Sequence, residues 1–156
     1  MSDLANRTAT IEKTFNAPLK LVWDAWTQSE HIVKWWAPKG MAINVIEHNF
    51  EVGGTWKYSM LMPDGNEFIS EGKYTEILIH EKIVTQADFK PMTQNVEIQI
   101  HFEADKGQTK FTFKVIHATP EYRKQQEEMG FYNGWGSAFD RLDMFLKDAI
   151  NNTKNP

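Results

Sequence analysis

The sequence predicts an α+β domain in which a curved, seven-stranded antiparallel sheet holds a long C-terminal helix against its concave face. Three observations support this fold class. Short segments of alternating apolar and polar residues follow one another from position 43 to 116, separated by Gly, Pro, Asn and Asp. Residues 131–149 carry apolar side chains at steps of three and four, which is typical of an amphipathic helix. Two short helical patterns lie between the first strand and these segments.

The N-terminal third begins with a strand at residues 8–15, where apolar and polar positions alternate. Pro18 then starts a helix, since the first helical turn has no need of the donor that proline lacks. A second short helix begins near Ser29 and ends before Pro38 and Gly40. The side chains predicted to face inward from the two helices are Leu19, Val22, Trp23, Trp26, Ile32, Val33 and Trp36.

Six further strands are predicted at residues 43–47, 55–62, 67–77, 82–87, 96–103 and 109–116. Alternation is clearest in three of them, where one face is apolar and the other carries residues such as Lys57, Ser59 and His101. We therefore expect a sheet with one dry face, covered by the helix, and one wet face. The predicted dry-face residues of these three strands are Trp56, Tyr58, Met60, Met62, Val96, Ile98, Ile100, Phe102, Phe111, Phe113 and Val115.

The helical region from residue 120 to 150 contains three glycines, Gly130, Gly134 and Gly136, although each costs about 1 kcal/mol relative to Ala inside a helix. One interpretation is a kink near Gly130 that separates a solvated first segment from a core helix. The other is that the missing side chains beside Trp135 leave room for a ligand. The pattern alone does not choose between them.

Composition limits the function classes. With 156 residues the chain predicts one domain, residues 1–150, followed by a disordered tail at 151–156. The absence of Cys excludes thiol chemistry and disulfides. A net charge of −4 without a basic stripe argues against nucleic acid as a partner. No signal peptide or membrane-spanning run is recognisable, so we expect a cytoplasmic protein without membrane insertion.

Large rings and thioethers are abundant, with six Trp, ten Phe, four Tyr and seven Met, and such side chains line cavities well. We therefore expect an internal, mainly apolar cavity between sheet and helix, with its mouth near Trp36 and Met41. It is expected to hold a small hydrophobic molecule and no cofactor. The candidate ligand-binding residues are Trp36, Met41, Trp56, Tyr58, Met60, Phe68, Tyr74, Ile98, Ile100, Phe111, Phe113, His117, Trp135 and Phe139.

Catalytic signatures are sparse, and no catalytic residue is assigned. The five His residues lie in different predicted elements without metal-ligand spacing, so no metal site is expected. Glu71 and His117 are the only candidates for an acid or base in the cavity, and Glu71 has the parity of the wet face. Arg7, Arg123 and Arg141 are expected to face solvent, which leaves the cavity without a clamp for an anionic group.

Four local motifs occur in order along the chain: residues 16–18 followed by 22–27, then Trp35-Trp36-Ala37-Pro38, Gly53-Gly54-Thr55-Trp56, and Gly134-Trp135 leading to Leu142. With the order of elements, they make the chain resemble the START-like, or Bet v 1-like (SRPBCC), helix-grip superfamily over residues 8–150. Within it, the chain is similar to stand-alone domains related to the C-terminal domain of the activator of the Hsp90 ATPase.

The resemblance implies a deep cavity between sheet and helix, which different members use to bind lipids, hormones or polyketides. Fold alone does not select a function. We expect binding of a small hydrophobic or aromatic ligand. The alternatives are an enzyme of the polyketide cyclase or hydrolase kind in the same cavity, and a co-chaperone of Hsp90 type or stress-related interaction domain. A homodimer is also possible, because Trp-rich helices can leave apolar surface.

Overall fold

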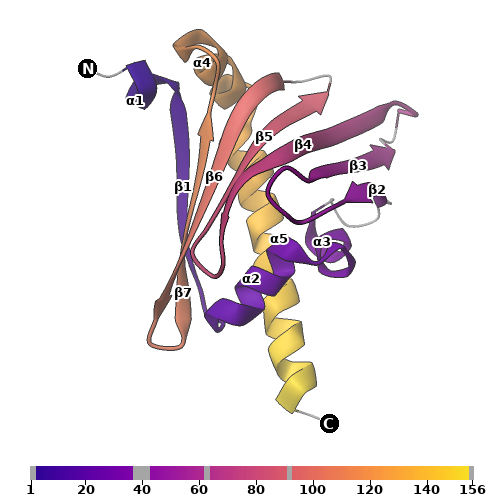
Figure 1. Cartoon of the computed structure of the whole chain (residues 1–156), viewed down its shortest axis with the longest axis vertical. Coiled ribbons are helices and arrows are strands. Elements are labelled where there is room, and N and C mark those ends of the chain that lie inside the picture. Colours follow the sequence, from indigo (N-terminus) through magenta and orange to yellow (C-terminus); the bar gives the residue numbers. More distant parts are fainter. Residues whose placement is uncertain (1–2, 37–42, 62–63, 91–92, 155–156) are drawn as a thin grey trace.

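The computed structural model describes residues 3–36, 43–61, 64–90 and 93–154, and it has the α+β architecture predicted from the sequence. A seven-stranded antiparallel sheet curves around one long helix (Figure 1). The strands are β1 (Thr8–Phe15), β2 (Ile43–His48), β3 (Thr55–Leu61), β4 (Glu67–Leu78), β5 (Lys82–Lys90), β6 (Thr93–Asp105) and β7 (Gln108–Ile116). The helices are α1 (Asp3–Arg7), α2 (Leu19–Thr27), α3 (Ser29–Trp35), α4 (Pro120–Glu128) and α5 (Phe131–Lys154). Only α1 has no counterpart among the sequence predictions.

The strand order is β1-β7-β6-β5-β4-β3-β2, so β1 and β2 form the two edges of the sheet. The chain between them must therefore cross from one edge to the other. It does so through α2 and α3, which lie together at one end of the sheet beside α5 (Figure 1). This crossing brings the apolar faces of α2 and α3 onto the same core as α5.

Irregular pairing contributes to the curvature of the sheet. The register shifts once between β2 and β3, once between β4 and β5, and once between β5 and β6. Such bulges add a residue to one strand and bend it. The shifts fall between Val45 and Glu47, Tyr74 and Glu76, and Ala87 and Phe89.

The predicted faces of the strands are confirmed at most positions; Met60 is only half-buried, and Met62 lies outside the described residues. The inward residues of β6 and β7 are buried, and so are Trp56 and Tyr58 of β3. Ser59, predicted on the wet face, is only 7% exposed. Its short side chain lies between the cross-strand neighbours Asn44 and Ile69, which leave little of it accessible to solvent.

The predicted helix break is present at Gly130, whose φ of 100° lies in the left-handed region that favours glycine. The break separates α4, which is rich in Glu, Gln and Lys, from α5. On α5 the most deeply buried side chains are Phe139, Leu142 and Leu146. The helix continues to Lys154 and so includes residues 151–154 of the predicted tail.

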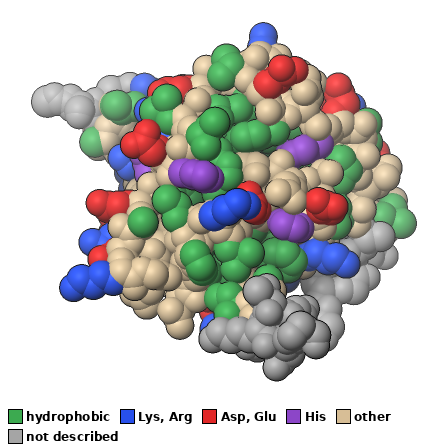
Figure 2. Space-filling view, turned by 60° about the horizontal axis from the view of Figure 1, so that its bottom comes forward, with side chains coloured by type: hydrophobic (Ala, Val, Ile, Leu, Met, Phe, Trp, Pro, Cys, Tyr) green, Lys and Arg blue, Asp and Glu red, His purple; other side chains and the backbone are tan. Residues whose placement is uncertain are grey.

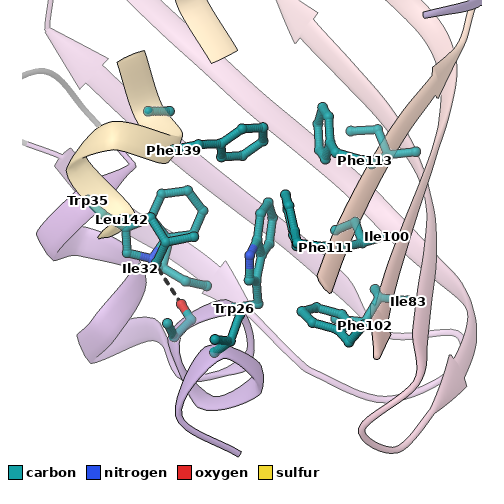
Figure 3. Packing of buried hydrophobic residues seen from close by; sticks show 14 of the residues in the cluster. Trp26, Ile32, Trp35, Ile83, Ile100, Phe102, Phe111, Phe113, Phe139 and Leu142 are labelled. Carbon is teal, nitrogen blue, oxygen red and sulfur yellow. Dashed lines mark hydrogen bonds between the residues drawn. The ribbon is translucent and has the colours of Figure 1, made fainter. Parts of the chain in front are cut away.

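Trp26 of α2 is the centre of the core. Its ring stacks on Phe111 of β7, with centroids 5.7 Å apart, and lies 6.2 Å from Phe139 of α5. Trp35 of α3 meets it edge-on at 4.7 Å and is itself fixed by a 3.0 Å hydrogen bond from its indole Nε1 to the carbonyl of Ala25 (Figure 3). Trp35, with no exposed surface, is therefore the anchor of α3, whereas the sequence pattern pointed to Trp36.

We expect Trp26→Ala to destabilise the protein by about 3–5 kcal/mol, because it removes a ring that helices and sheet share. Trp135→Ala should cost less, since Trp135 is only half-buried and borders open space. Urea unfolding of both variants measures the two free energies. Equal losses would mean that Trp26 is not the central contact.

Gly72 of β4 lies beneath the ring of Trp56. A Cβ at this position would stand 2.7 Å from the indole and would also collide with the carbonyl oxygen of Gln86. The close approach lets the indole Nε1 of Trp56 donate a 2.8 Å hydrogen bond to the hydroxyl of Thr85. Glycine is thus required here for a packing reason.

Gly72→Ala should therefore lower the free energy of unfolding by about 1–3 kcal/mol through overpacking. Gly136→Ala is the matched control. A Cβ at Gly136 meets no atom within 4 Å, and the exchange should stabilise α5 by about 0.5–1 kcal/mol. Chemical denaturation that shows the same sign for both variants would contradict this account of Gly72.

Candidate functional site

Two cavities lie between the sheet and the helices. The larger has a volume of about 250 Å³ and the smaller about 30 Å³. Trp36 and Trp135 line both, and their rings meet edge-on with centroids 5.7 Å apart. These two rings form the boundary between the cavities.

The predicted ligand-binding residues divide between these spaces. Met60, Phe68 and His117 line the larger cavity together with Trp36 and Trp135. Phe111 and Phe139 are core residues that line neither cavity, and Met41 lies outside the described residues. Those that line the smaller cavity are Trp36, Trp56, Tyr58, Tyr74, Ile98, Ile100, Phe113 and Trp135.

The sequence predicted a single deep cavity, and the structure has two spaces instead. The space in the deep part of the grip is nearly filled, and the larger cavity is separate from it. The filling has a clear cause, since Trp26 and Ile32 enter from α2 and α3 and line the smaller cavity. A volume of 30 Å³ is about that of one water molecule in the liquid. Of these two cavities between sheet and helices, the larger has the size of a ligand site.

The larger cavity is built against one face of α5. Its helical lining includes Gly134, Trp135, Ala138 and Arg141, which recur at steps of one, three and three. A Cβ at Gly134 would meet no atom within 4 Å, so the glycine does leave open space beside Trp135. Val115, Gly130 and Gly134 were anticipated as a dry-face residue and as glycines that leave space. The lining residues that sequence reasoning missed come from β4, the end of β5, the α4–α5 region and the outer part of α5: Ser70, Phe89, Gln126, Met129, Phe131, Ala138 and Arg141.

His117 presents a neutral imidazole to this cavity. Its Nδ1 lies 3.2 Å from the backbone carbonyl of Arg7, and because a carbonyl only accepts, Nδ1 carries the proton. Burial lowers the pKa of His117 because it disfavours the charged ring, although the Arg7 carbonyl acts in the opposite direction. The lone pair of Nε2 is then the acceptor that His117 offers.

Arg141 corrects the expectation that all three arginines face solvent. Its Nε donates to the carbonyl of Trp35 at 3.1 Å and its Nη2 to that of Trp36 at 3.3 Å. These carbonyls end α3 and have no partner in the helix, so a cation is favoured there. The long side chain of Arg141 can thus remain half-buried at the cavity.

The other two arginines are also half-buried. Arg7 donates from Nη1 to the carbonyl of His117 at 3.1 Å, which ties the N-terminus to the end of β7. Arg123 of α4 pairs with Glu127 at 3.2 Å. Neither lines the larger cavity.

The hydroxyl of Tyr58, one of the candidate ligand-binding residues in the deep part of the grip, is engaged within the protein. The Tyr58 hydroxyl lies 2.7 Å from Nδ1 of His48, whose Nε2 lies 2.7 Å from the carbonyl of Thr27. Since that carbonyl accepts from Nε2, a neutral His48 accepts from Tyr58 at Nδ1. Burial raises the pKa values of Tyr58 and Tyr74, which keeps both phenols neutral.

No catalytic constellation is found in the described part of the chain. Glu71 faces outward, as its parity predicted, and its carboxylate lies 3.7 Å from Nζ of Lys57. No three His, Asp or Glu side chains among the described residues are placed to hold a metal ion. Among the described lining residues, His117 is thus the one whose usual pKa lies near neutrality.

The surface in Figure 2, which brings the lower end of Figure 1 forward, carries acidic, basic and hydrophobic side chains side by side. A basic patch of the kind that binds a phosphate backbone is not visible on the described part of this face. Among the described residues, every helix is too short or too polar to cross a membrane.

Comparison with known proteins agrees with the geometry. Residues 16–147 match the family described as "Activator of Hsp90 ATPase homolog 1-like protein". The chain belongs to this family. The sequence matches none of the curated proteins closely enough for a relationship to be inferred.

Solved structures of the same fold come from several bacteria. A protein from Nitrosomonas europaea is 27% identical, with a TM-score of 0.81 over 94% of this chain and 98% of its own. One from Mycobacterium smegmatis is 24% identical, with a TM-score of 0.84 over 96% of each chain. An AHSA1-like protein from Aeromonas hydrophila is 21% identical, with a TM-score of 0.74 over 91% of this chain and 93% of its own. The helix-grip architecture of this family member is therefore shared.

The buried neutral state of His117 predicts acid sensitivity. Because its pKa is lower in the folded protein, the unfolded chain binds the proton more tightly, and stability present above about pH 6.5 is lost as pH falls toward the folded pKa. His117→Gln should make the free energy of unfolding fall less between pH 7 and pH 5. Urea titrations at both pH values test this. Burial also lowers the pKa of His101, but His101 is present in both proteins, so its contribution to the pH dependence cancels in the comparison. Identical pH dependence would contradict the prediction.

Proposed function

We propose that this protein binds a small, mainly apolar molecule in the larger cavity. The observation that carries the proposal is an open volume of about 250 Å³ lined mostly by rings, thioethers and small apolar side chains. Ligand sites in proteins have this character, a predominantly apolar wall with a few polar groups that fix orientation. Here those polar groups are Ser70, His117, Gln126 and Arg141.

The volume limits the size of the ligand. It exceeds the cavity of about 150 Å³ that takes up benzene and lies just below the range of about 300–1,000 Å³ typical of drug-sized ligands. A molecule with one or two rings, or a short chain, suits this space. Long lipids do not, unless part of the molecule remains outside.

We propose binding without turnover, because the described residues that line the cavity supply one neutral imidazole and no carboxylate. A cyclase or hydrolase would need a second group to exchange protons with His117. The absence of such a partner from the lining favours a binding module.

A second candidate rests on the family description, which names the activator of Hsp90 ATPase. Pull-down with purified Hsp90, compared with the same protein saturated with a cavity ligand, tests this role separately. If Hsp90 no longer retains the ligand-saturated protein, ligand binding and chaperone contact are linked.

The uncharged fluorescent probe N-phenyl-1-naphthylamine should bind one-to-one with a dissociation constant near 1 μM, about −8 kcal/mol. Burial of apolar surface should give a negative heat-capacity change. Gly134→Leu should weaken binding by about tenfold or more, because the new side chain occupies the cavity. Fluorescence titration and calorimetry measure both effects.

Gly136→Leu is the matched control for this test. Gly136 lies on the same helix and does not line the larger cavity. A Cβ at Gly136 would also meet no atom within 4 Å. This variant should bind the probe as the parent does. No binding by the parent up to millimolar probe would rule out the proposed function, and equal weakening in both variants would place the site elsewhere.

A further inference from the structure

Among the described residues that line the larger cavity, Arg141 carries the one fixed charge. Arg141 stands among lining residues that include no Asp, Glu or Lys, and His117 is held neutral there. The chain as a whole carries a net charge of −4, so the cavity has the opposite sign from the protein. A local positive field within an apolar wall favours a bound anion.

Arg141 has no carboxylate partner among the described residues. Its only hydrogen bonds there run to the two carbonyls of Trp35 and Trp36. Asp140, the neighbouring acid on α5, is 79% exposed and pairs with Lys13 at 3.5 Å. Residues 37–42, which follow Trp36, contain no acidic side chain. These positions therefore place no carboxylate in contact with the guanidinium, although the nearby charge of Asp140 raises the pKa of Arg141 and so opposes part of the effect of burial.

The carbonyls fix Arg141 without neutralising it. They take up donors on Nε and Nη2, whereas a guanidinium has five N–H groups, so three remain. Burial lowers the pKa of Arg141, which reflects the cost of keeping the charge out of water. An anion that met the free donors would offset part of that cost and would find the group already oriented.

We propose that the ligand is an amphipathic monocarboxylic acid whose carboxylate pairs with Arg141. This inference rests on the proposed function of the larger cavity. The apolar body would lie over Gly134 and Ala138 and point toward Phe131 at the α4–α5 turn. Arg141 follows Phe131 by ten positions, so this face of the helix is about 15 Å long at 1.5 Å per residue.

A carboxylate suits the site better than a phosphate ester. Arg141 supplies a single unit of charge and a planar set of donors, which match the charge and shape of a carboxylate. A phosphate dianion would leave one negative charge uncompensated in an apolar cavity. The phosphate is therefore treated as a competing outcome of the test.

The experiment compares 2-naphthoate with 2-naphthamide and 2-naphthyl phosphate, three ligands with the same ring system. Calorimetry at low ionic strength and pH 7 should show that the carboxylate binds at least about tenfold more tightly than the neutral amide. In Arg141→Met this preference should disappear, and in Arg141→Lys it should be reduced, because lysine keeps the charge without the planar donors. Arg123→Met, which removes an arginine outside the cavity, should keep the full preference.

The outcomes separate this inference from the proposed function. Equal affinity for carboxylate and amide in the parent protein would overturn the role of Arg141 while leaving the cavity as a binding site. Tighter binding of the phosphate would overturn the carboxylate assignment. A failure of all three ligands and of N-phenyl-1-naphthylamine would overturn both proposals. The comparison in the parent protein decides the matter even if Arg141→Met does not fold.

Discussion

The fold depends on the insertion of Trp26 between the sheet and α5. Because β1 and β2 are opposite edges of the sheet, α2 and α3 must cross its open end, and the crossing places Trp26 against Phe111 and Phe139. Aromatic rings at such distances contribute beyond their buried area. Trp35 locks the position by bonding to Ala25 and packing on Trp26. The side chain of Trp26 thus connects α2, the sheet and α5, which are distant from one another in sequence.

The same insertion determines where open space remains. Trp26 and Ile32 fill the deep end of the grip, and the boundary rings of Trp36 and Trp135 close it off. Beyond Trp135 the helix has Gly134 and Ala138 in place of large side chains, and the chain turns at Gly130. The aromatic residues fill the space at the centre of the grip, and the open volume therefore lies at the α4–α5 turn.

Local patterns predicted most of the fold and only part of the site. Alternation placed Ile98 and Phe113 on the inner face because parity is a local property of a strand. The position of Trp26 and the role of Arg141 depend on contacts between distant segments. Arg141 binds the carbonyls of Trp35 and Trp36, which are 106 and 105 residues away, and no periodicity encodes such a contact. The carbonyls at the end of a short helix, which have no partner within that helix, were the available signal.

Gly134 shows how stability and open space compete at this site. Packing does not demand a glycine, since a Cβ there would touch nothing within 4 Å, and helix propensity disfavours it by about 1 kcal/mol relative to Ala. Gly72 is different, because its missing Cβ is required by Trp56. Gly134 lines the larger cavity on the same helix as Arg141, and the space that its missing side chain leaves belongs to that cavity, whereas Gly136 has similar open space and does not line it. Gly134 lowers the stability of the helix locally, and the missing side chain leaves the cavity open.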